Sequence, residues 1–173
     1  ALVDTDTVLN VHIGSSGRLA ITAPDAPMDV MITLQPMNIV QAAADLLWSR
    51  VLQKFPDLRF AMSEGGIGWI PFFLEALDYQ LEQSSPSVIS ALSRKPSDYF
   101  KRQFYGCFWF EKNDISDTLH KVGIDNCLFE TDFPHPTSLW PIDNLEERLS
   151  SLTYEDRAKV LGLNAAKLYN IAI

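Results

Sequence analysis

Residues 126–132 read NCLFETD, a short and mostly apolar run that ends in an aspartate. Apolar residues at nearly every position are typical of a strand that is buried on both faces, as in a parallel sheet. A second stretch, YGCFWF at residues 105–110, has the same character. The run VLNVHI at 8–13 and the run LRFAMSE at 58–64 complete a set of four predicted strands.

Helices are predicted between and after these strands. Within residues 38–55, Val40, Ala43, Leu47 and Val51 recur with helical spacing and predict one buried face. The other predicted helices cover residues 70–83, 97–102, 114–122, 142–150 and 154–169. Strands that alternate with helices indicate an α/β fold, in which crossover helices join parallel strands. The length of 173 residues predicts a single domain.

Two segments are predicted to be irregular. Residues 14–36 contain the motif GSSG and three prolines, and residues 84–96 form a polar linker within the domain. Three polar residues are predicted N-caps of the helices that follow them: Asn38, Ser97 and Thr153, the last with Asp156 as a capping-box acid.

Composition argues against several classes of function. The formal net charge of −8 disfavours binding to a nucleic-acid backbone. No run of about 18 apolar residues is present, so no membrane-spanning helix is expected. No secretory signal is recognised at the start, and the cytoplasm is the expected compartment. Cys107 and Cys127 both lie in predicted strands and are expected to be buried, unreactive thiols.

Candidate site residues follow the predicted strands. The C-terminal ends of parallel strands share one edge, where α/β enzymes carry their active sites. His12 lies at the end of the first strand, Glu64 ends the second, Asp132 ends the fourth, and His135 lies just beyond. Imidazole and carboxylate groups are ligands of zinc, manganese and iron. Each residue alone also has a structural explanation, because strand-end histidines are often simply hydrogen-bonded and aspartates often cap turns.

Other residues and motifs have simpler interpretations. GSSG at residues 14–17 lacks the spacing of a serine-hydrolase elbow, and GGIG at 65–68 does not match a dinucleotide fingerprint. His120 is expected on the solvent side of its helix. Trp69 and Trp140 are expected to pack in the core rather than to line a pocket.

The combination of segments resembles the amidohydrolase-related family that includes aminocarboxymuconate-semialdehyde decarboxylase. VHIGSSG at 11–17 resembles its fifth-strand segment, and LFETDFPH at 128–135 resembles its eighth-strand signature. FPDLRF at 55–60 with SEGGIGWIP at 63–71 resembles the sixth-strand segment, and NAAKLY at 164–169 resembles the closing helix. The resemblance implies a TIM (β/α)8 barrel, of which residues 1–173 cover about strands 5–8 and the C-terminal helices. Strands one to four, with the family's first metal ligands, are expected to lie outside this sequence.

The resemblance also implies roles for the candidate residues. His12 and Asp132 become ligands of one divalent ion, with Asp132 also a general base. Zinc is the first choice of metal, and manganese or iron are alternatives. Decarboxylases of the family commonly carry a catalytic histidine at the end of strand six, where this chain has Glu64.

The reaction therefore stays open between hydrolysis and non-oxidative decarboxylation of a small carboxylated or ring substrate. In a decarboxylation, Glu64 or His135 is expected to protonate the carbon that loses carbon dioxide. A homodimer is expected, because relatives of this type are often dimers. The alternative is an inactive half barrel that acts as a binding or dimerisation module.

Overall fold

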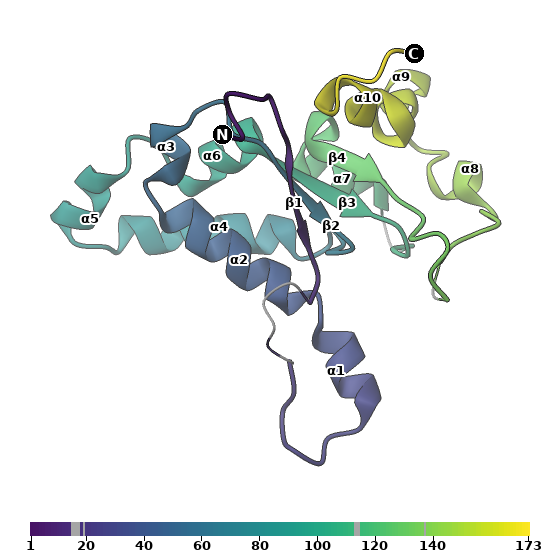
Figure 1. Cartoon of the computed structure of the whole chain (residues 1–173), viewed down its shortest axis with the longest axis horizontal. Helices are drawn as coiled ribbons and strands as arrows, with labels where there is room; N and C mark the ends of the chain where they lie inside the picture. Colours follow the sequence, from purple (N-terminus) through teal and green to yellow (C-terminus); the bar gives the residue numbers. More distant parts are fainter. Residues whose placement is uncertain (15–17, 19, 113–114, 137) are drawn as a thin grey trace.

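The computed structural model describes residues 1–14, 18, 20–112, 115–136 and 138–173. A four-stranded sheet in the order β1-β2-β3-β4 lies at its centre (Figure 1). The strands are β1 (Leu9–His12), β2 (Phe60–Ser63), β3 (Phe104–Phe108) and β4 (Cys127–Phe129). All three pairings are parallel, which confirms the four predicted strands and the α/β class. Within the described part, β1 pairs only with β2 and β4 only with β3, so both outer strands are sheet edges.

Helices connect each strand to the next, as the alternating pattern predicts. The connections and the C-terminal region contain α2 (Met37–Trp48), α3 (Val51–Lys54), α4 (Ile70–Glu82), α6 (Pro96–Gln103), α7 (Ile115–Val122), the 3-10 turn η1 (Ile124–Asn126), α8 (Leu145–Arg148), α9 (Tyr154–Ala158), the π-helical turn η2 (Lys159–Leu163) and α10 (Asn164–Leu168). The predicted helix 38–55 is divided into α2 and α3, and that at 142–150 shrinks to the single turn of α8. The predicted start of the helix at 114–122 lies outside the described residues.

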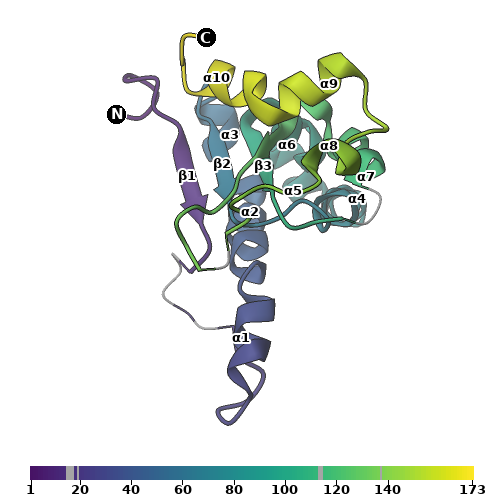
Figure 2. The same ribbon diagram turned by 90° about the vertical axis from the view of Figure 1, so that its right-hand side faces the viewer.

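Both segments that were predicted to be irregular contain a helix. α1 (Met28–Leu34) lies within residues 14–36, and α5 (Pro86–Ala91) lies within residues 84–96. Prolines were interpreted as loop signals, but Pro27 directly precedes α1 and Pro86 opens α5. Proline is tolerated at a helix start because its missing N–H needs no partner there. α1 projects from the rest of the molecule in both views (Figures 1 and 2), and none of its residues is buried.

One of the three predicted N-caps is confirmed. Thr153 accepts a hydrogen bond from the Asp156 backbone N–H (3.1 Å) and donates its hydroxyl to the Asp156 carboxylate (2.9 Å). Asn38 lies inside α2, whose N-cap is Pro36, and Ser97 lies inside α6, whose N-cap is Lys95. In both helices the proline next to the start moves the first turn upstream of the predicted cap.

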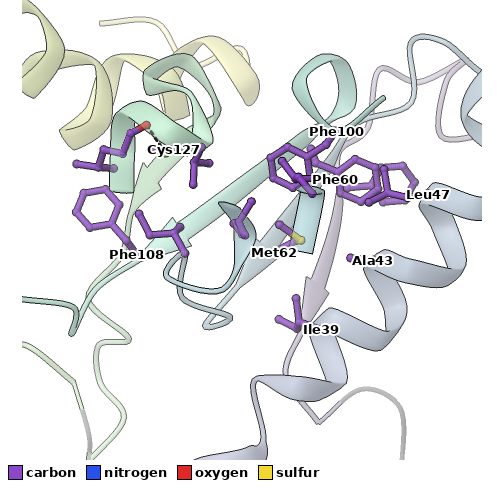
Figure 3. Packing of buried hydrophobic residues seen from close by; sticks show 14 of the residues in the cluster. Ile39, Ala43, Leu47, Phe60, Met62, Phe100, Phe108 and Cys127 are labelled. Atoms are coloured by element: carbon purple, nitrogen blue, oxygen red, sulfur yellow. Dashed lines mark hydrogen bonds between the residues drawn. The ribbon is translucent and has the colours of Figure 1, made fainter. Parts of the chain in front are cut away.

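One face of the sheet forms the main hydrophobic core. Figure 3 shows Ile39, Ala43 and Leu47 of α2 directed toward Phe60 and Met62 of β2. Each of these three positions is no more than 2% exposed, which confirms the predicted Ala43 and Leu47 and adds Ile39. Val40 and Val51, which were also predicted on the buried face, are only partly buried and 37% exposed, respectively. α4, α6 and α7 add their buried sides to the same core. The helices therefore cover this face and leave the strand ends free.

The opposite face of the sheet is covered by the C-terminal helix. Ala61, Cys107 and Leu128 pack there against Leu168 of α10. Cys107 and Cys127 are free and buried, as expected. Burial raises the pKa of both thiols, which keeps them protonated and unreactive.

The C-terminal helix is also bound to the first strand region. The Tyr169 hydroxyl donates to Oδ1 of Asn10 (2.5 Å), and the Asn170 amide donates to Oδ2 of Asp6 (2.7 Å). Arg59 donates to the carbonyl oxygen of Leu168 (3.2 Å) and pairs with Asp6. Residues at the two extremes of the chain thus meet at the N-terminal end of the sheet.

The helical stretch Met28–Trp48 is a candidate membrane-spanning segment, although none was expected from the sequence. By length and composition alone, these 21 residues are long and apolar enough to cross a membrane. One such stretch is weak support for insertion, because core helices of soluble proteins can pass the same test. The α2 half contributes core side chains, whereas the α1 half is not buried.

Truncating the central aromatic stack is expected to destabilise the protein. Phe104 is fully buried, and its ring stacks on Phe60 (4.7 Å between centroids) and Phe100 (5.6 Å). The substitution Phe104→Ala should lower the free energy of unfolding by about 3–5 kcal/mol, measured by urea denaturation. The matched control is Phe72→Ala on α4, where the side chain is 77% exposed. A change of similar size in the control would contradict this account of the core.

Candidate functional site

Four predicted site residues gather at the C-terminal ends of the strands, an edge called the rim below. His12 is the last residue of β1 and is in register with Ser63, the last residue of β2. Glu64 follows β2 directly, and its Oε1 lies 2.7 Å from Nε2 of His12. Asp132, three residues beyond the end of β4, lies close enough to Glu64 for its charge to raise the pKa of the Glu64 carboxyl group. The parallel register thus brings together residues that are up to 120 positions apart in the sequence.

His135 lies at the outer side of this cluster. Its Nδ1 is 3.3 Å from Oδ2 of Asp132, and its backbone N–H donates to the Asp132 carbonyl oxygen (2.8 Å). The His135 side chain is 64% exposed, whereas that of Asp132 is 9% exposed. Asp132 therefore lies between an exposed imidazole and the half-buried Glu64.

The backbone at Glu64 and at Asp132 is unusual. Both residues adopt a φ of 59°, in the left-handed region that side chains rarely occupy. Aspartate tolerates this conformation better than glutamate, which has no special preference for it. Each strand therefore turns sharply as it leaves the sheet, and the turn directs the carboxylate across the rim.

Two carboxylates that the sequence reasoning missed support these turns. Oε1 of Glu130 accepts a hydrogen bond from the Glu64 backbone N–H (2.6 Å). Oε1 of Glu111 accepts from the Ile67 backbone N–H (2.6 Å), three residues further along the same turn. Glu130 was detectable as a charged residue inside the apolar run 126–132, and Glu111 as an acid three residues after β3.

Burial and mutual repulsion dominate the electrostatics of the rim. Burial raises the pKa of Glu130 to about 7, and the neighbouring Glu64 and Asp132 carboxylates act in the same direction. The pKa of Glu64 is raised, first by burial and then by Asp132, although the His12 partner opposes the shift. The pKa of His12 is raised above its usual value by the Ile13 carbonyl and by Glu64. Protons are therefore held more tightly at this rim than at exposed groups of the same type.

Trp69 and Trp140, which were both expected to pack in the core, differ in their burial. Trp69 packs against the core as predicted, and its indole N–H donates to the carbonyl oxygens of Gly65 (3.0 Å) and Gly66 (3.1 Å). Trp140 was expected in the core but is 61% exposed and packs edge-on against Phe133. The prediction failed because Trp140 lies in the loop after β4, beyond the reach of the helices that build the core. His120 is exposed on α7, as expected.

The imidazole and carboxylate groups at the rim are of the kinds that bind a divalent metal ion, but too few of those in the described part of the chain converge to hold one. His12 Nδ1 is bound to the Ile13 carbonyl oxygen (2.7 Å), which leaves Nε2 as the nitrogen that faces the carboxylates. Metal-binding histidines are commonly oriented in this way. Across the described ranges, however, no group of three His, Cys, Asp or Glu side chains is arranged to hold a metal ion. These residues alone do not complete a site, because a metal ion in a protein usually needs at least three protein ligands.

Comparisons with protein-family models and with known proteins point to the same family. The amidohydrolase family model matches residues 1–171. A γ-resorcylate decarboxylase from Polaromonas is 26% identical over 136 residues, which are 75% of this chain and 39% of that enzyme. The chain therefore spans well under half of the length of this relative.

Solved structures share the fold at low sequence identity. An amidohydrolase from Mycobacterium avium subsp. paratuberculosis has a TM-score of 0.79 at 20% identity, over 96% of this chain and 43% of that one. A dihydroxybenzoic acid decarboxylase from Polaromonas was solved with manganese and the inhibitor 2-nitroresorcinol. It has a TM-score of 0.66 at 21% identity, over 98% of this chain and 52% of that one. A 2,6-dihydroxybenzoate decarboxylase from Rhizobium has a TM-score of 0.69 at 20% identity, over 98% of this chain and 53% of that one.

Removing the acceptor at Glu130 is expected to destabilise the protein more than removing its charge. Glu130→Gln keeps a carbonyl oxygen for the Glu64 N–H, whereas Glu130→Leu leaves this donor without its acceptor. The leucine variant should therefore unfold with a free energy about 1–3 kcal/mol below that of the glutamine variant in urea denaturation. Equal stabilities would show that the Glu64–Glu130 hydrogen bond contributes nothing.

Proposed function

Because the chain belongs to the amidohydrolase family, we propose that it forms part of an enzyme that decarboxylates a small hydroxylated aromatic acid without oxidation. The observation that carries the proposal is the position of Glu64 next to both His12 and Asp132 at the rim. The relatives named as decarboxylases of γ-resorcylate and dihydroxybenzoate support the choice of reaction and substrate class. These relatives are distant in sequence and therefore support a class of substrate rather than one compound.

The reaction needs a proton donor close to the ring. Loss of carbon dioxide breaks the bond between the ring and the carboxylate, and its electron pair remains on the ring carbon. A proton must then be added to that carbon, so the enzyme needs a group that is still protonated at the working pH. Glu64 suits this role, because burial and the Asp132 carboxylate raise its pKa.

The remaining residues have supporting roles in this proposal. The Asp132 carboxylate raises the pKa of Glu64 and so favours retention of the proton on Glu64. Nε2 of His12 contacts Glu64 in this structure (2.7 Å). With a metal ion bound, this nitrogen would bind the ion instead, because Nδ1 is engaged with the Ile13 carbonyl oxygen, and the carboxyl group of Glu64 would be released from His12. The exposed His135 beside Asp132 can exchange protons with solvent and restore the one that is consumed.

We also propose that His12 and Asp132 contribute two ligands to a divalent-metal site. Such an ion would bind the anionic oxygens of the substrate and withdraw charge from them. The manganese in the Polaromonas decarboxylase supports this proposal. Since the described rim residues do not complete a site, the other ligands would come from residues outside the part of the chain that the structure describes, or from further protein. In the same proposal, the parallel sheet with its two edges is part of a (β/α)8 barrel.

The proposal predicts that Asp132→Asn loses decarboxylation with little effect on stability. Asparagine also tolerates a left-handed backbone, but it has no charge to raise the pKa of Glu64. Turnover of a panel of hydroxybenzoates, followed as phenol formation by chromatography, should fall at least about 100-fold. The matched control is Asp117→Asn on α7, whose exposed carboxylate pairs with Lys121 on the surface.

Several outcomes would contradict this proposal. Near-normal turnover by the Asp132→Asn variant would remove Asp132 from the reaction. Hydrolysis of esters or amides by the wild-type protein, without decarboxylation of any hydroxybenzoate, would favour the hydrolase alternative. If the wild type has neither activity, the chain would fit the inactive binding module instead.

Metal content gives a second prediction. The complete protein that supplies the remaining ligands should hold about one divalent ion per chain by mass spectrometry of the elements, which also identifies the metal. His12→Ala should reduce this content at least tenfold after dialysis, because it removes one proposed ligand. His120→Ala, on the exposed side of α7, is the control. An unchanged content in the His12 variant would exclude His12 as a ligand.

A further inference from the structure

The turn after β2 is held by a carboxylate from the neighbouring loop. Glu111 lies three residues beyond β3, and its Oε1 accepts the Ile67 N–H at 2.6 Å. Its other oxygen, Oε2, accepts the Trp109 N–H at 3.1 Å. One carboxylate therefore joins the loop after β2 to the loop after β3, and its charge strengthens both hydrogen bonds.

Gly66 makes room for this carboxylate. A Cβ atom at Gly66 would lie 2.6 Å from Oε1 of Glu111, closer than two such atoms can approach. Gly66 also has a φ of +65°, a conformation that glycine adopts without strain. The backbone of the turn can approach Glu111 so closely only because position 66 has no side chain. By contrast, a Cβ atom at Gly68 would meet nothing within 4 Å.

The backbone of Glu111 is held by a hydrogen bond from Arg148. Nη2 of Arg148, the last residue of α8, donates to the carbonyl oxygens of Trp109 (2.6 Å) and Glu111 (2.5 Å). The loop after β3 is therefore bound to a helix that follows β4. A carboxylate on an anchored backbone can hold a neighbouring turn more rigidly than one on a free loop.

The same turn is held at its other end by Glu130, which accepts the Glu64 N–H at 2.6 Å. Glu64 lies between this contact and the Glu111 contact at Ile67, and it has the left-handed backbone described above. Two fixed ends determine the path of the chain between them, and with it the direction of the Glu64 carboxylate toward His12. We propose that Glu111 is a positioning residue, which acts through Ile67 and Gly66 to hold Glu64 in its place at the rim.

The catalytic part of this inference rests on the proposed function, but the structural part can be tested without it. The first measurement is the hydrogen-exchange rate of the Ile67 amide in the purified protein, by mass spectrometry of fragments that span the turn. Glu111→Ala should accelerate this exchange about tenfold, because the amide loses its acceptor. Glu75→Ala, which removes an exposed carboxylate on α4, should leave the rate unchanged.

The second measurement is steady-state decarboxylation of the best hydroxybenzoate of the panel. Glu111→Ala should lower kcat by about 100-fold while KM changes less than about threefold, because displaced groups mainly affect the transition state. Glu111→Gln keeps one carbonyl acceptor and should recover part of the loss. Gly66→Ala should reproduce the loss of kcat by displacing the Glu111 carboxylate, whereas Gly68→Ala should not.

The outcomes separate the two proposals. If Glu111→Ala fails to fold, Glu111→Gln and Gly66→Ala decide the question. Unchanged Ile67 exchange in these variants would overturn the inference, and so would accelerated exchange with an unchanged kcat. If the wild type decarboxylates nothing, the proposed function fails. Accelerated exchange would then still support the Glu111 contact, while the positioning of Glu64 for decarboxylation would fall with the function.

Discussion

The candidate site depends on the parallel register of the four strands. Because all strands point the same way, the residues that follow them emerge at one edge, although the chain travels through several helices between one strand and the next. His12 faces Ser63 across the first pair of strands, and this places Glu64 one residue later within hydrogen-bond distance of the imidazole. A shift of one residue in this register would turn every strand side chain to the opposite face and separate the pair.

The rim concentrates negative charge in a small volume. Glu64, Glu111, Glu130 and Asp132 all lie there; the other three carboxylates raise the pKa of Glu130, and Asp132 raises the pKa of Glu64. Backbone N–H groups compensate part of this charge at Glu111 and Glu130, and His12 compensates another part at Glu64. An aromatic carboxylate would be repelled by such a surface unless a cation were also bound, which agrees with the proposed divalent ion.

Much of the fold and part of the site could be predicted from the sequence. β3 and β4 were recognisable because strands buried on both faces are apolar nearly throughout, and β1 and β2 because they are short apolar runs closed by glycine. The rule about strand ends then selected His12, Glu64 and Asp132. Their geometry was not predictable, because glutamate has no preference for the left-handed backbone that it adopts at position 64. Glu111 and Glu130 were missed because their role is to accept backbone N–H groups, and no spacing in the sequence marks such contacts. α1 and α5 were missed because proline at a helix start resembles proline in a loop.

The contacts between Asp6, Asn10 and the C-terminal residues have a consequence for folding. Asn170 binds Asp6 across 164 positions of the sequence, and Tyr169 binds Asn10 across 159. A ribosome completes β1 long before α10 exists, so these contacts form only when nearly the whole chain has emerged. Parallel pairing adds further long-range contacts, and folds with many such contacts acquire their native structure slowly. Until that time, the apolar face of the sheet that α10 later covers is exposed, and such exposed surface favours aggregation of a folding chain.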